Sequence, residues 1–116
     1  MMRTVARSKL RGLRITQTDL QYEGSLTLGS APMAAADIVP GERIQVVNLN
    51  NGTRLETYVI EGRPDSGECV LNGPAARLGV VGDVVHVISY ALVDVGEDTR
   101  GLPRSIRVDD RNRPIG

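Results

Sequence analysis

The sequence predicts a mainly β protein, a small β-barrel with short helices. Many short stretches alternate apolar and polar residues, and turns marked by glycine, proline and asparagine separate them. Hydrophobic residues make up 41% of the 116 residues, yet the only aromatic side chains are three tyrosines, so the core must be aliphatic. A chain of this length is expected to form a single domain, residues 1–116.

Local patterns predict the other elements between the strands. Residues 18–20 read as a turn or a short helical start, and residues 32–36 as a helix with Ser30 as its N-cap. Asn51-Gly52 predicts a hairpin, because both residues tolerate positive φ, and residues 72–78 can form one helical turn. The predicted strands, in chain order, are 3–9, 13–16, 25–28, 42–49, 53–60, 69–71, 84–92 and 105–108.

The predicted strand at 84–92 and the residues that follow it differ in polarity. Residues 84–92 are the most apolar stretch and should lie centrally in the sheet. From Gly96 the chain is polar and rich in arginine, and Gly101 and Pro103 interrupt it. About residues 96–116 are therefore expected to be a partly flexible tail.

Charge and cysteine content narrow the class of protein. Fourteen basic and fourteen acidic residues cancel, whereas a surface for nucleic acid or anionic membrane usually needs a basic excess. No apolar run is long enough to span a membrane, and the N-terminus has no hydrophobic signal core. Cys69 is the only cysteine, and no Cys/His cluster suggests a metal site. We therefore expect a cytoplasmic protein without nucleic-acid or membrane partners.

Gly24-Ser25 can support self-cleavage of the chain. Glycine permits strained backbone conformations, and a hydroxyl directly after it can attack the Gly24 carbonyl to form an ester. Loss of the Ser25 α-proton would break that ester by β-elimination, and hydrolysis of the dehydroalanine would leave a pyruvoyl group and ammonia. The ketone would then act as an electron sink, as pyridoxal phosphate does elsewhere. Considered alone, Gly-Ser is an ordinary turn.

Further residues, in a fixed order and spacing along the chain, support the interpretation of Gly24-Ser25 as a cleavage site. The set comprises Arg3-Thr4, Lys9, Thr16, Asp19-Leu20, Tyr22-Glu23-Gly24-Ser25, Asn51-Gly52, Arg54, Thr57-Tyr58, Asn72-Gly73 and Gly82-Asp83. In this order and spacing the chain resembles the aspartate 1-decarboxylase family. The resemblance implies a double-psi β-barrel, a homotetramer, and a zymogen that cleaves into residues 1–24 and 25–116. It also implies a lyase that converts L-aspartate to β-alanine and CO2 for pantothenate and coenzyme A biosynthesis.

The resemblance also assigns roles to residues. It implies that Ser25 becomes the pyruvoyl cofactor and forms the Schiff base with substrate, and that Tyr58 is the proton donor. Gly24, Ser25 and Thr57 would take part in cleavage. The implied substrate-binding residues are Lys9, Arg54, Thr57, Asn72, Gly73, Pro74 and Ala75. Of these, Arg54 offers a bidentate fork and Lys9, the only lysine, a second positive charge for the two carboxylates.

The chain departs from the family pattern at three places. Pro74 stands where alanine is usual, Arg11-Gly12 replaces a His-Arg pair near the substrate entrance, and His86 replaces an aliphatic pocket residue. Pro74 removes one backbone N–H donor. These departures bear on substrate binding and pH dependence rather than on the class of reaction.

Two other interpretations stay open at this stage. A catalytically silent small β-barrel could act as a binding or assembly module, although it would have no reason to keep Lys9, Arg54, Thr57 and Tyr58 beside Gly24-Ser25. A pyruvoyl enzyme could also act on another amino acid, such as glutamate. Whether maturation is spontaneous or needs a helper protein is a further open question.

Overall fold

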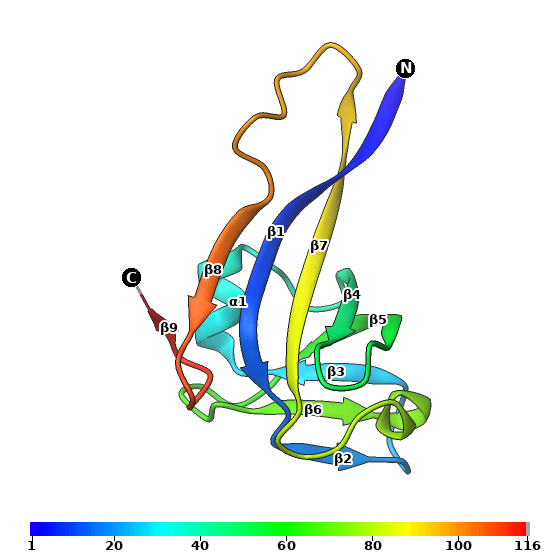
Figure 1. Ribbon diagram of the computed structural model, residues 1–116, viewed down its shortest axis with the longest axis vertical. Coiled ribbons are helices and arrows are strands. Elements are labelled where there is room, and N and C mark those ends of the chain that lie inside the picture. Colours follow the sequence, from blue (N-terminus) through cyan, green and yellow to red (C-terminus); the bar gives the residue numbers. More distant parts are fainter. Residues whose placement is uncertain (116) are drawn as a thin grey trace.

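The computed structural model describes residues 1–115, which form mainly strands (Figure 1). One nine-stranded sheet has the order β2-β6-β3-β5-β4-β7-β1-β8-β9. Its elements are β1 (Met2–Arg14), β2 (Gln17–Asp19), β3 (Ser25–Leu28), α1 (Ser30–Ala36), β4 (Arg43–Asn48), β5 (Arg54–Glu61), β6 (Cys69–Asn72), η1 (Gly73–Arg77), β7 (Val84–Asp94), β8 (Arg104–Val108) and β9 (Pro114–Ile115).

The first strand is longer than predicted. The prediction of separate strands at 3–9 and 13–16 is wrong, because one strand, β1, runs without a break from Met2 to Arg14 and ends before residues 15 and 16. Its register against β7 shifts between Ala6 and Ser8 and again between Leu10 and Leu13. Gly12, at φ +86°, lies in the second shift. The extra residues are absorbed by bulges, which disturb the sequence alternation without ending the strand.

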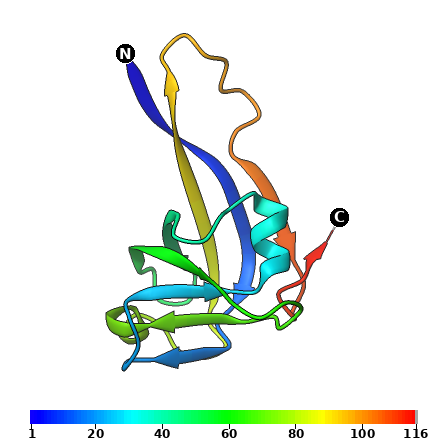
Figure 2. The same cartoon turned by 180° about the vertical axis from the view of Figure 1, so that it is seen from behind.

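Strands β1 and β7 form a long ribbon that extends beyond the rest of the molecule (Figures 1 and 2). β7 lies between β4 and β1, so the predicted central position of 84–92 is confirmed. β8 pairs with β1 in parallel, and α1 lies beside β8 and β1 (Figure 2). The predicted last strand at 105–108 is therefore confirmed as β8.

Strand β3 lies between two partners of opposite direction. It pairs with β5 in parallel and with β6 antiparallel, so Ser25 lies opposite Asn72. β4 and β5 form the predicted hairpin, with Gly52 at φ +77°. This arrangement brings the start of β3, the middle of β5 and the end of β6 together.

Four local predictions have mixed outcomes. The helical turn within 72–78 is confirmed as η1, and the helix at 32–36 is confirmed as α1. Ser30 is not the N-cap, because it is the first helical residue and Gly29 holds the cap position without a side-chain bond. The prediction of a turn or short helical start at 18–20 is wrong, because residues up to Asp19 form β2, which pairs in parallel with β6. The turn begins only after Asp19.

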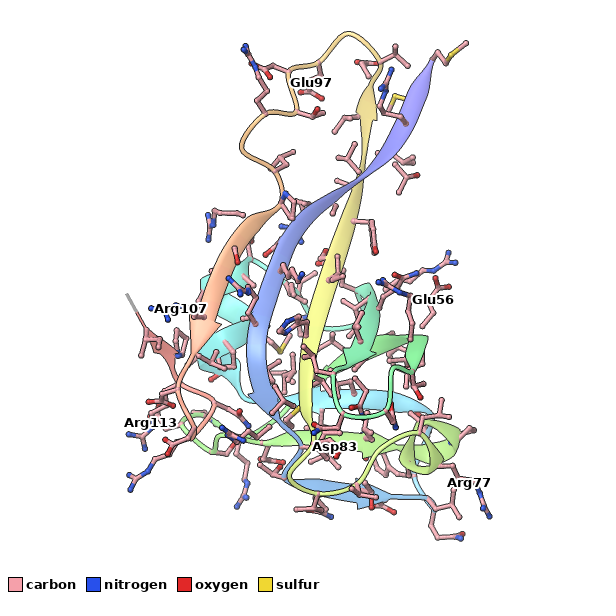
Figure 3. All side chains as sticks on the ribbon, viewed as in Figure 1. Glu56, Arg77, Asp83, Glu97, Arg107 and Arg113 are labelled. Atoms are coloured by element: carbon pink, nitrogen blue, oxygen red, sulfur yellow. The ribbon has the colours of Figure 1, made fainter. Side chains whose placement is uncertain are left out.

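The core is aliphatic, as predicted, and charged side chains such as Glu97, Arg107 and Arg113 extend away from the ribbon (Figure 3). Its largest fully buried side chains are Leu10, Leu13, Ile15, Leu26, Leu28, Met33, Ile44, Leu71, Val46, Val59, Val85 and Val87. No helix within residues 1–115 is long and apolar enough to cross a membrane.

The C-terminal segment returns to the body of the protein. The Asn112 side chain is buried and donates hydrogen bonds to the backbone oxygens of Arg14 (2.9 Å) and Gly67 (2.8 Å). The partial flexibility expected for residues 96–116 stays a prediction, and Gly116 lies outside the described residues.

Candidate active site

Ser25 is a fully buried hydroxyl at the first position of β3. Its Oγ donates a hydrogen bond to the backbone oxygen of Glu23 (2.9 Å) and accepts one from Asn72 Nδ2 (3.0 Å). A buried hydroxyl with both a donor and an acceptor partner is held in a defined orientation. The Ser25 side chain is therefore ordered beside the peptide bond that self-cleavage would break.

Asn72 links the two hydroxyls on one face of β3. Besides Ser25, its Nδ2 donates to Thr27 Oγ1 (2.9 Å), and its side chain is buried at the end of β6. The sequence analysis did not predict Thr27 as a site residue. Because Ser25 and Thr27 are two residues apart on a strand, their side chains share a face, and that spacing was the signal that could have found Thr27.

Gly73 lies against the backbone of Gly24. Gly73 has φ +65°, and a Cβ built on it would lie 2.7 Å from both the Cα and the N of Gly24. Any other residue at position 73 would collide with the backbone there and would also be strained. The start of η1 therefore fixes the position of the predicted cleavage site through a contact between two glycines.

A cavity of about 280 Å³ lies beside Gly24. Besides Gly24 it brings together three further predicted site residues, Thr57 from β5 and Pro74 and Ala75 from η1. Ala75 is buried and Thr57 is half-buried. Its full lining is Gly24, Leu55, Glu56, Thr57, Pro74, Ala75 and Leu78.

The Tyr58 hydroxyl contacts the residue before the predicted cleavage site. Tyr58 Oη donates to Glu23 Oε2 at 3.2 Å, and the side chain is 37% exposed. Partial desolvation, then the negative charge of Glu23 and this hydrogen bond, raise the pKa of Tyr58 above its usual range. The phenol therefore keeps its proton over a wide pH range. The sequence motif contained Glu23 but gave its side chain no role.

Arg54 starts β5 on the same strand face as Tyr58, four residues away and thus roughly 13 Å along the strand. Its guanidinium donates to Gln45 Oε1 (2.8 Å), which also accepts a hydrogen bond from Tyr90 Oη (2.7 Å). Arg54 forms no ion pair within residues 1–115. Its charge is thus free to meet a carboxylate.

Lys9 lies on a strand far from that of Ser25 in the sheet order. It pairs with Ile88 of β7 and Ser105 of β8, and β5, β4 and β7 lie between its strand and β3. Within the described residues Lys9 takes part in no ion pair. One chain therefore gathers Ser25, Thr57, Tyr58, Asn72 and the η1 residues, but Lys9 lies on another part of the sheet.

Comparison with solved structures defines the class of fold. The rationally designed protein mkDPBB_sym_86 matches 66% of this chain and 90% of its own, with a TM-score of 0.50 and 16% sequence identity. The chain is accordingly a double-psi β-barrel, as the resemblance implied.

Comparison of sequences defines the family. The profile of the aspartate decarboxylase family matches residues 1–115, so the chain belongs to that family. The aspartate 1-decarboxylase of Thermoanaerobacter pseudethanolicus is 44% identical over 115 residues, covering 99% of this chain and 98% of the relative. That of Pelotomaculum thermopropionicum is 49% identical over 115 residues, covering 99% of this chain and 87% of the relative.

Proposed function

We propose that this protein cleaves itself between Gly24 and Ser25 and then decarboxylates L-aspartate to β-alanine and CO2 with a pyruvoyl group made from Ser25. The observation that carries the proposal is the buried Ser25 hydroxyl, held between Glu23 and Asn72 at the end of a backbone that Gly73 fixes in place. The product would serve pantothenate and coenzyme A biosynthesis, the pathway implied by the resemblance.

The cleavage step uses groups that lie at the site. Ser25 Oγ adds to the Gly24 carbonyl carbon, the Gly24 C–N bond breaks, and the freed Ser25 amine takes up a proton. Asn72 Nδ2, 3.0 Å from Ser25 Oγ, holds the nucleophile, and Thr57, in the cavity beside Gly24, supplies a hydroxyl for the oxyanion. The result is an ester between Ser25 and Gly24.

The ester then breaks by elimination. Ser25 loses its α-proton, Gly24 leaves as a carboxylate, and water replaces the nitrogen at position 25, which departs as ammonia. Thr27 and Asn72 also line a second hollow of about 490 Å³, which gives water a place beside the polar side of Ser25. The residues present therefore fit the formation of a pyruvoyl group at this position.

The pyruvoyl group supplies a ketone that takes up the substrate amine and accepts the electrons released with CO2. The other steps fall to ordinary side chains. Arg54, with no ion-pair partner among the described residues, binds one substrate carboxylate, and Lys9 binds the other. Tyr58 delivers the proton that replaces CO2, a role that its raised pKa supports.

The position of Lys9 supports a site that two copies of the chain complete. Three strands separate the strand of Lys9 from that of Ser25 in the sheet order, which favours a Lys9 supplied to the Ser25 site by a second copy. A second copy that presents its β1/β7 face to the Ser25 region would supply the missing charge, and a homotetramer is the assembly we propose. A stable monomer in light scattering at micromolar concentration would contradict this assembly.

Intact mass spectrometry of purified protein tests the maturation. We expect two chains, residues 1–24 and 25–116, the second lighter by one ammonia than the same fragment beginning with serine. Incubating the purified precursor alone, with no other protein present, tests whether a helper is needed. One uncleaved chain that nevertheless decarboxylates aspartate would refute the pyruvoyl proposal.

The silent-barrel alternative is not favoured, because the chain belongs to an enzyme family. Assaying the processed protein with L-aspartate and L-glutamate separately decides between the two dicarboxylic substrates. We expect turnover of aspartate.

A further inference from the structure

His86, the only histidine of the chain, contacts the backbone of the neighbouring strand. The Gly12 N–H donates a hydrogen bond to His86 Nδ1 at 3.2 Å. Gly12 lies at the second bulge of β1, where the pairing with β7 passes from Leu10–Val87 to Leu13–Val85. The bulge frees the Gly12 N–H from the regular ladder, so it can point at the imidazole. Two of the departures noted in the sequence, Gly12 and His86, therefore form one structural unit.

This hydrogen bond fixes the protonation of the ring. Because Nδ1 accepts, a neutral His86 must carry its proton on Nε2, on the other side of the ring from Gly12. Desolvation, then the positive charge of Lys9, lower the pKa of His86 below its usual range; a backbone hydrogen bond at Val85 opposes this shift, and Arg11 adds to it. At neutral pH the ring thus offers one N–H donor without adding a charge.

Two positive charges act on His86, Lys9 and Arg11, both from β1. On the other side His86 lies opposite Val47 of β4, and Val47 lies opposite Arg54, which places Arg54 two strands from His86. Within residues 1–115, none of these three cations belongs to an ion pair. A neutral N–H donor among unpaired cations is suited to a carboxylate, which accepts several hydrogen bonds at once.

We propose that His86 is a substrate-binding residue whose Nε2–H donates a hydrogen bond to the carboxylate held by Lys9. This inference rests on the proposed function, because it takes Lys9 as a carboxylate-binding residue. His86 adds directional recognition where Lys9 supplies a point charge. The Gly12–His86 pair sets the tautomer that makes this donor available.

Nitrogen NMR of the tag-free, processed protein tests the proposal directly, because a single imidazole gives signals that need no assignment among histidines. We expect the Nε2–H tautomer at pH 7. Succinate, a dicarboxylate without an amine, should shift the Nε2 signal, and the shift should disappear in Lys9→Ala at the same succinate concentration. An Nδ1–H tautomer would overturn the proposal, as would ring signals unmoved at concentrations of succinate that inhibit the enzyme.

Kinetics of two variants provide a second, independent readout. His86→Leu keeps apolar volume but removes the donor, so KM for aspartate should rise about 10–100-fold with kcat little changed. His86→Gln places an amide N–H near the Nε2 position and should stay within about threefold of the parent KM. Both variants should be fully cleaved, which shows that the site is intact. An unchanged KM in His86→Leu would overturn the proposal.

The failure of this inference can be told apart from failure of the proposed function. If the processed parent protein does not decarboxylate aspartate, the proposed function is wrong, and the succinate titration still decides whether His86 and Lys9 share a carboxylate. If the parent is active but neither the NMR signal nor KM responds, only the role of His86 is wrong.

Discussion

The buried start of β3 and the outer face of β1 and β7, which carries Lys9 and Arg11, differ in how their polar and charged groups are paired. Around Ser25, polar atoms are paired within one chain, through Glu23, Asn72 and Thr27. On the outer face, Lys9 and Arg11 are cations without an ion-pair partner among the described residues. The first region pairs the groups proposed for cleavage within one chain, whereas the second presents unpaired positive charge to a neighbouring molecule. We infer that one chain carries maturation and that substrate recognition depends on assembly.

Ser25→Ala should have the largest effect on this comparison. Without the hydroxyl no ester can form, so cleavage and decarboxylation should both be absent, as gel electrophoresis and an aspartate assay would show. The fold should persist, because Asn72 Nδ2 keeps its hydrogen bond to Thr27 Oγ1. Ser30→Ala, on α1, is the matched control and should be cleaved like the parent. Full activity in Ser25→Ala would end the pyruvoyl proposal.

Tyr58→Phe should separate cleavage from catalysis. The ring stays but the acid is lost, so kcat should fall about 10²–10⁴-fold while cleavage at Gly24–Ser25 remains complete. The pyruvoyl content is checked by mass before kcat is measured. Turnover at the parent rate in fully processed protein would show that Tyr58 only packs against the barrel.

Arg54→Ala should act mainly on substrate binding. Arg54 is exposed in the single chain, and the proposed assembly would desolvate its contact with the substrate carboxylate. Loss of such a charge-assisted contact costs about 2–4 kcal/mol, so KM for aspartate should rise roughly 30- to 1000-fold. Arg43→Ala is a matched control, because Arg43 is exposed and paired with Glu56 instead (Figure 3 shows Glu56). Equal effects of the two substitutions would argue against a specific role for Arg54.

Mixing two inactive variants tests whether the outer face of one copy completes the buried site of another. Lys9→Ala and Ser25→Ala chains, coexpressed in equal amounts, should regain about a quarter of the parent activity, because random pairing joins an intact Ser25 to an intact Lys9 in one site of four. A mixture no more active than its separate components would mean that each chain uses its own Lys9.

Glu23→Gln should have the smallest effect. The negative charge of Glu23 helps to raise the pKa of Tyr58, so removing it should lower that pKa and move the alkaline loss of kcat to lower pH. Near neutral pH, kcat should change by no more than about twofold, since the phenol remains protonated in both proteins. Cleavage is verified first, because Glu23 adjoins Gly24. An alkaline limb that does not move would show that Glu23 does not influence the pKa of Tyr58 in the working enzyme.

Local chemistry explains which parts of the fold the sequence could predict. The aliphatic core, the Asn51-Gly52 hairpin and the central strand at 84–92 follow from side-chain size, turn geometry and hydrophobicity, which act over a few residues. The break predicted within β1 failed because Gly12 permits a bulge, and pairing with β7 on one side and β8 on the other stabilises the strand through it. Cross-strand partners of that kind leave no trace in a local pattern.

The candidate site divides in the same way. By itself the sequence pointed to Gly24-Ser25 as the predicted cleavage site and, through resemblance, to the residues expected around it. Only the tertiary structure decided that Gly73 lies against Gly24. The same is true of the hydrogen bonds from Tyr58 to Glu23 and from the Gly12 N–H to His86 on the neighbouring strand. It also placed Lys9 away from Ser25. The physical reason is that reactivity belongs to the covalent structure of a residue, whereas donors, neighbouring charges and close backbone contacts come from segments that meet only when the sheet forms.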